Sequence, residues 1–269
     1  GLVNVLNSPG SFTVFAPTND AFSAFLGAAG FASVDDVPVP VLTQILLNHV
    51  VAGTVQSSQL STGYVSTLAT FNGVADGSPL SLYVNTSNGV RLNGVSTVTM
   101  PNILASNGIV HVVDAVIGLP TVVTFATADP TFSTLVAALT ELTPATDFAT
   151  VLSGAGPFTV FAPTNAAFDA LDAELAPGGI AGLDETTLTN VLNYHVASGN
   201  VRSSALTPNG NTVVETLLTG NNFTITLPGT GGNIANVTDG AGRPDIGIIA
   251  VDVQAANGVI HVLNKVLLP

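Results

Sequence analysis

Residues Phe12–Asn19 read FTVFAPTN, and the same eight residues return without change at Phe158–Asn165, 146 positions later. The first four residues of this stretch are aromatic or β-branched, so they favour a buried strand. Pro17 has no N–H to continue a ladder of hydrogen bonds, and Thr18 is a favourable N-cap residue. Apolar residues then recur at helical spacing, so each copy is predicted to be a strand that ends and turns directly into a helix.

Two further segments repeat in the same order along the chain. The run NGIVHV at Asn107–Val112 corresponds to NGVIHV at Asn257–Val262, and between the signatures ILLNHV at Ile45–Val50 corresponds to VLNYHV at Val191–Val196. Asn-Gly is a common tight-turn pair because both residues tolerate positive φ, so this last signature predicts a turn followed by a second central strand. Three matches in one order indicate an internal duplication and therefore two domains.

Taken together, these residues resemble the fasciclin family, whose domains carry a first signature like TVFAPTN, a central Tyr-His element and a last signature like NGVIHV. Both copies match the first and last signatures, but the Tyr-His pair is present only as Tyr194-His195, since the first copy has Asn48-His49. The resemblance covers essentially the whole chain. It implies an α+β fold in which each domain is a compact β-wedge of short strands flanked by helices.

The repeat divides the chain into a first domain at residues 1–119 and a second at residues 120–269, joined by a short linker that contains Pro. In the second copy Thr121–Pro157 precedes the signature, and its apolar spacing predicts helices that pack on the domain. Only Gly1–Ser11 precedes the signature in the first copy, which is therefore expected to lack a leading helical segment and to expose an apolar groove. Three explanations stay open: residues that precede Gly1 in a longer chain, processing, or a segment of a neighbouring molecule that fills the groove.

The composition excludes several classes of function. Only 8% of the residues are charged, and 17 acids against 4 bases give a net charge of −13. Four scattered cations cannot form a basic patch, so neither nucleic acid nor anionic lipid is an expected partner. There is no Cys for a disulfide or a thiolate site. No apolar run reaches the ~18 residues of a membrane span, and no signal peptide is expected within the chain.

Each copy contains two histidines, His49 with His111 and His195 with His261. A metal or acid–base pair is one interpretation, but no HExxH motif or third ligand accompanies them. The alternative is a buried ring that hydrogen-bonds the backbone, and we favour it. His111 and His261 are accordingly expected to have protein partners and no metal, and no cofactor is expected. The residues expected to be structural are Thr18, Asn19, His49, His111, Thr164, Asn165 and His261.

Other motifs for chemistry are absent or weak. The sequence contains no GxSxG elbow, and the Gly-rich pair Gly154 and Gly156 precedes a strand, so it is no phosphate cradle. The loop Asp239–Asp245 contains two acids and two glycines, and it is a weak candidate for calcium. Three Asn residues fit the N-glycosylation pattern, although the sequence does not decide whether they are modified: Asn85, Asn222 and Asn236.

The resemblance to the fasciclin family also implies candidate binding residues. In animal members, adhesion is attributed to an Asp-Ile pair before the last signature and to the Tyr-His element. Counting back from Asn257, the Asp-Ile position is Asp252-Val253 in the second copy and Asn102-Ile103 in the first, and the Tyr-His element is Tyr194-His195. An acid at Asp252 suits a metal-mediated contact of the integrin type. The alternative, which we favour, is a loop acid without a partner.

Three hypotheses about function follow. The first is a non-enzymatic, extracellular module for adhesion or matrix interaction, secreted or attached to a cell surface, that binds a protein or glycan. The second is a self-assembling structural subunit of an extracellular fibre or surface layer. The third is a hydrolase or isomerase, which requires a pocket with convergent titratable groups.

The signature strands carry a prediction about burial. The two signatures of each copy are expected to lie close together in space, with their apolar side chains mostly buried. These side chains are Phe12, Val14, Phe15, Val112, Phe158, Val160, Phe161 and Val262.

Overall fold

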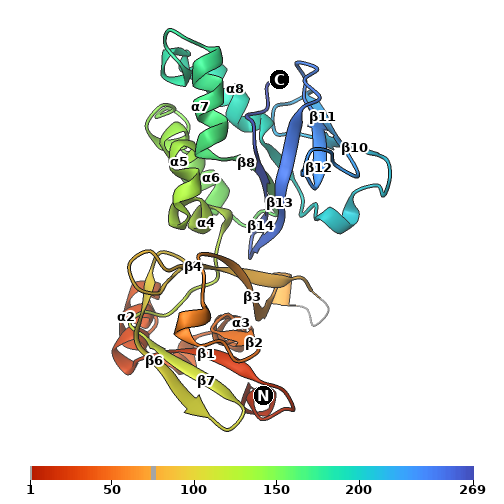
Figure 1. Ribbon diagram of the computed structural model, residues 1–269. Coiled ribbons are helices and arrows are strands. Elements are labelled where there is room, and N and C mark those ends of the chain that lie inside the picture. The colour runs from red at the N-terminus through yellow and green to blue at the C-terminus, as the bar shows by residue number, and fades with distance from the viewer. Residues whose placement is uncertain (1, 74–76) are drawn as a thin grey trace. The chain divides into compact units, whose positions relative to one another are not determined.

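The computed structural model describes residues 2–73 and 77–269 and consists of two units. One unit contains Gly1–Pro120 with Gln254–Ala256, and the other contains Thr121–Val253 with Asn257–Pro269. Both are built from short helices and strands (Figure 1). The α+β fold class predicted from the sequence is thereby confirmed.

The elements of the first domain, in chain order, are α1 (Leu2–Leu6), β1 (Phe12–Pro17), α2 (Asn19–Ala29), η1 (Val34–Asp36), α3 (Val39–Leu47), β2 (Val50–Ala52), η2 (Ser57–Gln59), β3 (Gly63–Thr70), η3 (Phe71–Gly73), β4 (Pro79–Asn85), β5 (Arg91–Leu92), β6 (Ser96–Ala105) and β7 (Gly108–Val113). The strands form a closed barrel in the order β1 to β7.

The elements of the second domain are α4 (Val122–Ala128), η4 (Pro130–Phe132), α5 (Ser133–Thr140), α6 (Phe148–Ser153), β8 (Phe158–Pro163), α7 (Asn165–Glu174), η5 (Ile180–Gly182), α8 (Glu185–Tyr194), β9 (Val196–Ser198), η6 (Ser203–Ala205), β10 (Asn211–Glu215), β11 (Asn222–Thr226), β12 (Ala235–Thr238), β13 (Ile246–Ala255) and β14 (Gly258–Leu263). Its strands form one seven-stranded sheet in the order β10-β11-β12-β13-β14-β8-β9.

The repeated FTVFAPTN stretch folds as its residues predict. Phe12–Pro17 and Phe158–Pro163 are strands, and a helix begins directly after Thr18 and after Thr164. The hydroxyl oxygen of each Thr accepts a hydrogen bond at 3.2 Å from the backbone N–H three residues later. This is the N-cap interaction that satisfies a free donor in the first turn of a helix.

The first and last signatures of each domain lie side by side as parallel strands. Phe12 is in register with Gly108 on β7, and Phe158 is in register with Gly258 on β14. A Cβ on either glycine would lie 2.1 Å from the carbonyl oxygen of the facing Phe. The Gly of the last signature is therefore required by this close approach of two backbones, a reason different from the positive-φ turn that the sequence suggested.

In the second domain a helical cover, defined as α4 to α6, packs against one face of β8 and β14. Helix α4 contacts β14, and α5 contacts α7; these helices lie along one side of the sheet (Figure 1). By register, Leu6 of α1 corresponds to Leu152 of α6, so α1 is the counterpart of α6 alone. Among the described residues, the first domain has no counterpart of α4 and α5 before β1.

None of the eight side chains predicted to be mostly buried is exposed, and they differ only in degree. Phe15, Phe161, Val160 and Val262 are buried as expected. The four side chains that are only partly buried are Phe12, Val14, Val112 and Phe158. Both Phe residues begin their strands, whereas Val14 and Val112 lie on the face that α4 and α5 cover in the second domain.

Each domain has its own apolar core. In the first domain Phe15 packs with residues that include Leu82, Val84 and Val113, and in the second Phe161 packs with a larger set that includes Phe223. No single helix in residues 2–73 and 77–269 is long and apolar enough to cross a membrane. Within the same described residues, one bent pair of helices, Val122–Ala128 and Pro130–Thr140, reaches that length and composition when the two are taken together.

Candidate functional site

The candidate binding residue Asp252 lies on β13, where the backbone has a positive φ of 62°. Its Oδ1 accepts a hydrogen bond from the backbone N–H of Ser203 at 2.8 Å, and its Oδ2 accepts one from Ser203 Oγ at 2.5 Å. An ion pair with Arg202 at 3.3 Å completes the contacts, and the Asp252 side chain is 18% exposed. Both carboxylate oxygens are thus used within the domain.

The charge state of Asp252 follows from these contacts. Burial opposes its ionisation, but the hydrogen bonds from Ser203 and the charge of Arg202 hold the pKa of this carboxyl below its usual value. Asp252 is therefore a carboxylate at neutral pH and joins β13 to η6. The neighbouring Val253 is 6% exposed and belongs to the interior.

The first domain keeps the geometry of this site without its charge. Asn102 also has a positive φ, 65°, and lies at the position that corresponds to Asp252. Its Oδ1 accepts a hydrogen bond from the Ser57 N–H, and its Nδ2 donates one to Ser57 Oγ, both at 2.9 Å. An amide and a carboxylate thus perform the same local task in the two domains, and only the second has an acid here.

Tyr194 and His195, the other two candidate binding residues, are buried. Tyr194 is 0% exposed, its hydroxyl donates to the Asn222 carbonyl at 2.6 Å, and its ring packs edge-on against Phe223. Burial raises the pKa of Tyr194, so its phenol stays neutral. In this conformation neither side chain is accessible to another molecule. Their role in binding stays a prediction.

His49 and His195 have matching environments at the ends of α3 and α8. In His195, Nδ1 lies 2.7 Å from the Val191 carbonyl, and Nε2 accepts a hydrogen bond from the Leu267 N–H at 2.9 Å. His49 contacts the Ile45 carbonyl and the Ile117 N–H in the same way. Burial lowers the pKa of both imidazoles, that of His195 to about 4, so both rings are neutral.

His111 and His261, of the last signatures, use the opposite ring nitrogens. His261 Nε2 lies 2.8 Å from the Val201 carbonyl, and its Nδ1 accepts the Asp252 N–H at 3.4 Å. His111 makes the corresponding contacts with Val55 and Asn102. Burial lowers the pKa of His261. The protein partners predicted for both rings are present.

Two asparagines of the signatures have roles that the sequence did not reveal. Asn165 donates from Nδ2 to the Pro130 carbonyl and accepts the Thr134 N–H, which fixes η4 and α5 on α7. Asn257 accepts the Val122 N–H at 2.9 Å and donates to the carbonyls of Leu152 and Gly154, so it connects α4 and α6 to the last signature.

The first copy preserves only part of this arrangement. Asn107 donates to the Leu6 carbonyl, at the end of α1, while Asn19 is exposed. Asn165 and Asn257 of the second domain are therefore the anchors for the helical cover. Their spacing alone gave no signal for this role because their partners lie up to 135 residues away.

The two acids of the candidate calcium loop interact with cationic side chains and backbone N–H groups of the same domain. Asp239 binds the Arg243 side chain at 2.7 Å and accepts the Leu268 N–H, and Asp245 forms an ion pair with Lys265. Among residues 2–73 and 77–269, no group of three or more His, Asp or Glu side chains is arranged to hold a metal ion. This loop fastens the C-terminal segment to the domain.

Comparison with known proteins identifies the class of this fold. The family model described as the fasciclin domain matches twice, at residues 1–120 and 130–269. The chain therefore belongs to the fasciclin-domain family. A solved FAS1 domain pair from the insect cell adhesion molecule fasciclin I superposes with a TM-score of 0.57 at 20% identity, covering 100% of this chain and 92% of that one.

The chain matches a different share of the length of each of two curated relatives. The transforming growth factor-beta-induced protein ig-h3 of Sus scrofa is 30% identical over 273 residues, which are 98% of this chain and 35% of that protein. The cell surface glycolipoprotein MPB83 of Mycobacterium bovis is 32% identical over 149 residues, 55% of this chain and 60% of its own length. The chain thus spans about a third of the larger relative.

Proposed function

We propose that this chain is a non-enzymatic, extracellular module of adhesion or matrix interaction, secreted or attached to a cell surface. The observation that carries the proposal is the presence of two fasciclin domains over nearly the whole chain. Similarity to a domain pair of a cell adhesion molecule and to a cell surface glycolipoprotein supports it. The expected partner is a protein or glycan of the cell surface or matrix.

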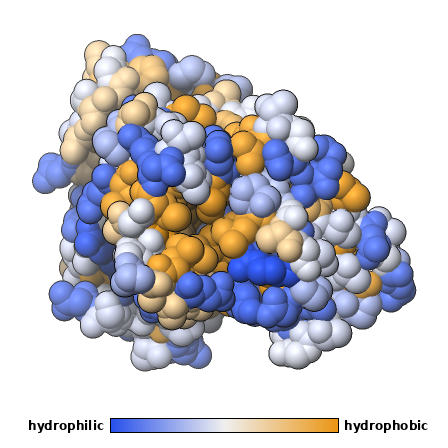
Figure 2. All heavy atoms as spheres, turned by 90° about the horizontal axis from the view of Figure 1, so that it is seen from above, coloured by the Kyte–Doolittle hydropathy of each residue, from blue (hydrophilic) through white to orange (hydrophobic). Residues whose placement is uncertain are grey.

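The surface chemistry is compatible with such partners. Charged residues are only 8% of the chain, so most of its polar surface is neutral. The face drawn in Figure 2 has apolar side chains gathered in one region with hydrophilic side chains around them. Interfaces between proteins combine an apolar centre with a polar rim in this way.

We place the contact at Asp252, because among the four candidate binding residues it alone is not fully buried. Its ion-pair partner Arg202 is also partly exposed. Together they present one acid and one base on a domain with few charges. Charges at the edge of an interface mainly affect the rate and specificity of association.

The substitution Asp252→Asn tests this placement. It reproduces the amide found naturally at Asn102, which makes the equivalent contacts with Ser57. The variant is expected to keep its melting temperature within a few degrees while surfaces coated with it retain fewer cells of the source organism than wild-type coatings do. If the variant retains as many cells, Asp252 is not the contact; if wild type retains no more than an albumin coating, the adhesion proposal is wrong.

Self-assembly into a fibre or surface layer is the second candidate function. It is favoured by the strand face of the first domain that contains Val14 and Val112, which is only partly buried. Light scattering across concentrations is expected to show association that Val112→Asn weakens. The matched control is Val213→Asn, at a Val that is 58% exposed in the second domain. A monomer at every concentration contradicts this alternative.

A further inference from the structure

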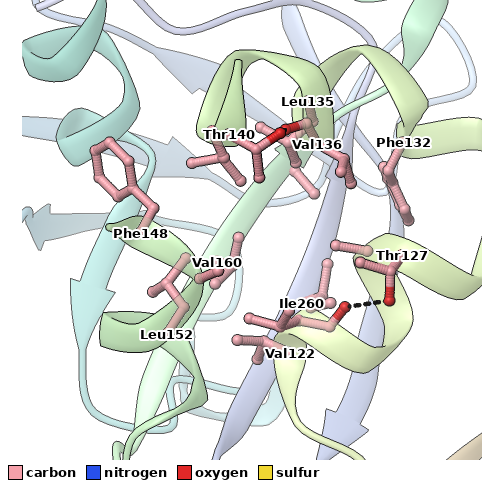
Figure 3. A pocket seen from close by; sticks show the side chains of 15 residues that line it. Val122, Thr127, Phe132, Leu135, Val136, Thr140, Phe148, Leu152, Val160 and Ile260 are labelled. Carbon is pink, nitrogen blue, oxygen red and sulfur yellow. Dashed lines mark hydrogen bonds between the residues drawn. The ribbon is translucent and has the colours of Figure 1, made fainter. Parts of the chain in front are cut away.

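An apolar cavity of about 70 Å³ lies within the second domain, between the helical cover and the signature strands. Its floor is formed by Val160, Ala162 and Ile260 of β8 and β14, and buried Phe132 and Phe148 stand in its walls. Side chains from α4, α5, α6 and both strands converge on this space (Figure 3). The volume is several times the ~10–15 Å³ that one water molecule needs.

The lining offers almost nothing for a polar ligand to bind. Its two polar side chains are Thr127 and Thr140. The Thr127 hydroxyl donates to the Val123 carbonyl at 2.9 Å, as drawn in Figure 3, and the Thr140 hydroxyl donates to the Val136 carbonyl at 2.8 Å. Each donor is thus used within its own helix. A molecule that enters the cavity must be apolar there, because a polar group without a partner is costly to bury.

The cavity opens to solvent between the helices. Three of its lining residues, Thr127, Thr140 and Ala149, are exposed, while the floor is buried. A ligand can therefore insert one end and leave the other end in water. This arrangement suits an elongated molecule with an apolar tail.

The charges near the cavity discriminate between head groups. Within residues 121–157 the charged side chains are Asp129, Glu141 and Asp147, all acidic. Glu141 follows the lining residue Thr140, and Asp147 precedes the lining residue Phe148. None of the chain's four cations lines the cavity. A free carboxylate on the ligand would meet like charges and no base.

The first domain provides an internal comparison. The residues that correspond to the floor are Val14, Ala16 and Val110, and they are partly exposed. The described part of the first domain has no counterpart of α4 and α5 to form walls above them. The cavity is therefore a product of the helical cover and not of the signature strands alone.

We propose that the second domain binds the tail of a long-chain aliphatic molecule without an anionic head group in the cavity between α4, α5, α6 and the strand pair β8–β14, with the head group outside. Each methylene that enters leaves water for a wholly apolar surface. Extending the tail by two methylenes inside the cavity tightens binding by roughly tenfold. The gain ends once the cavity is filled, so the tail length at which it ends measures the depth of the site.

The test uses the whole chain and a neutral fluorescent probe, N-phenyl-1-naphthylamine, displaced by straight-chain alcohols of increasing length. Decanol is expected to displace the probe at a concentration roughly tenfold below that of octanol. Decanoate, which has a negative head group, is expected to compete less well than decanol.

Two variants locate the binding. Ala149→Phe fills the mouth from α6, and Ala126→Leu reduces the space from α4; both are expected to weaken probe and decanol binding by roughly tenfold or more. Ala173→Phe adds the same exposed ring on α7, away from the cavity, and is expected to bind as wild type does. Circular dichroism checks that all three are folded.

Two results would overturn the proposal. One is equal binding by Ala149→Phe and Ala173→Phe, which would place the probe elsewhere, for example on the partly buried face of the first domain. The other is no displacement by any alcohol up to its solubility limit.

Discussion

At the scale of single residues, the histidines show how strongly the interior selects one protonation state. Both ring nitrogens of His195 face backbone groups, one a carbonyl and the other an N–H. Only a neutral ring with its proton on Nδ1 satisfies both, because a second proton would point at the N–H of Leu267. His49 is held in the same way.

Because the pKa values of these buried imidazoles are lowered, the protein is expected to lose stability in mild acid. The pKa of His195 is about 4 in the folded state, against 6.5 for an exposed imidazole. The unfolded chain therefore binds more protons between these values, so this contribution is complete above pH 6.5 and is lost as pH falls toward 4. It amounts to roughly 3 kcal/mol for His195 alone. Urea unfolding at pH 7, 6, 5 and 4 measures it.

The variant His195→Gln provides the control. It is expected to be less stable at pH 7 and to show a shallower dependence on pH between 6.5 and 4. Asp252, whose pKa is lowered, contributes stability that is lost only at lower pH, as its carboxylate becomes protonated. An unchanged slope in the variant would contradict the role assigned to His195.

At the scale of elements, the helical cover is joined to the strands by a few side chains. Asn257 is 6% exposed, and its amide makes hydrogen bonds to α4 at Val122 and to the end of α6 at Leu152 and Gly154. One side chain thus positions two helices relative to β14. The cavity beneath those helices depends on the same contacts.

Asn257→Ala is expected to loosen the cover more than the sheet. It leaves a buried N–H and two carbonyls without partners, which costs roughly 1–3 kcal/mol for each group that stays dry. Hydrogen exchange is expected to accelerate in α4 and α6 and to change little in β11 and β12. Asn236→Ala is the control, since the hydrogen bonds of the Asn236 side chain join Thr230 and Asn233 and involve no residue of the cover. Equal acceleration throughout the domain would show that Asn257 stabilises more than the cover.

The features that could be predicted from the sequence are those that depend on interactions between residues close together in the chain. Thr18 and Thr164 cap helices because their partners lie three residues away. Identical residues at Val14 and Val160 nevertheless differ in burial, since only the second lies beneath α4 and α5. Burial of this kind depends on a distant segment, and no pattern within the signature contains that information.

Long-range contacts also limited what could be predicted of the candidate site. Tyr194 was identified through a resemblance, but its burial depends on a contact with Asn222, 28 residues away. The partners of Asp252 at Arg202 and Ser203 are 49 or more residues distant. The cavity requires residues from Val122 to Ile260. Spacing along the chain does not report such assemblies.

At the scale of the whole molecule, the duplicated chain has two apolar cores, and equivalent residues pack at the centre of each. Phe15 and Phe161 occupy equivalent positions, and each lies beside the His of its own last signature, with ring centroids 5.6 and 5.4 Å apart. Both are at most 1% exposed. Among the described residues, the core around Phe15 is built from the first domain and the core around Phe161 from the second.

Phe161→Ala and Phe15→Ala are expected to act on different domains. Each substitution removes a buried ring and is expected to lower the stability of its own domain by ~3–5 kcal/mol. Hydrogen exchange resolved by residue measures both domains in one sample. Phe161→Ala is expected to accelerate exchange in β11 and β14, and Phe15→Ala in β4 and β7. Acceleration of both domains by either variant would mean that the two cores are coupled.

The parallel pairing of the signatures has a consequence for synthesis on the ribosome. Phe12 pairs with Gly108 and Phe158 with Gly258. The first strand of each domain therefore cannot form this pairing until the last strand of the domain has been synthesised. At ~5–20 residues per second, translation of the roughly 100 intervening residues takes about 5–20 s. During that interval one edge of an aromatic, β-branched strand emerges from the exit tunnel without its parallel partner, as a target for chaperones. A nascent chain arrested before Gly108 therefore contains nearly all of the first domain's residues but not the strand that closes its barrel.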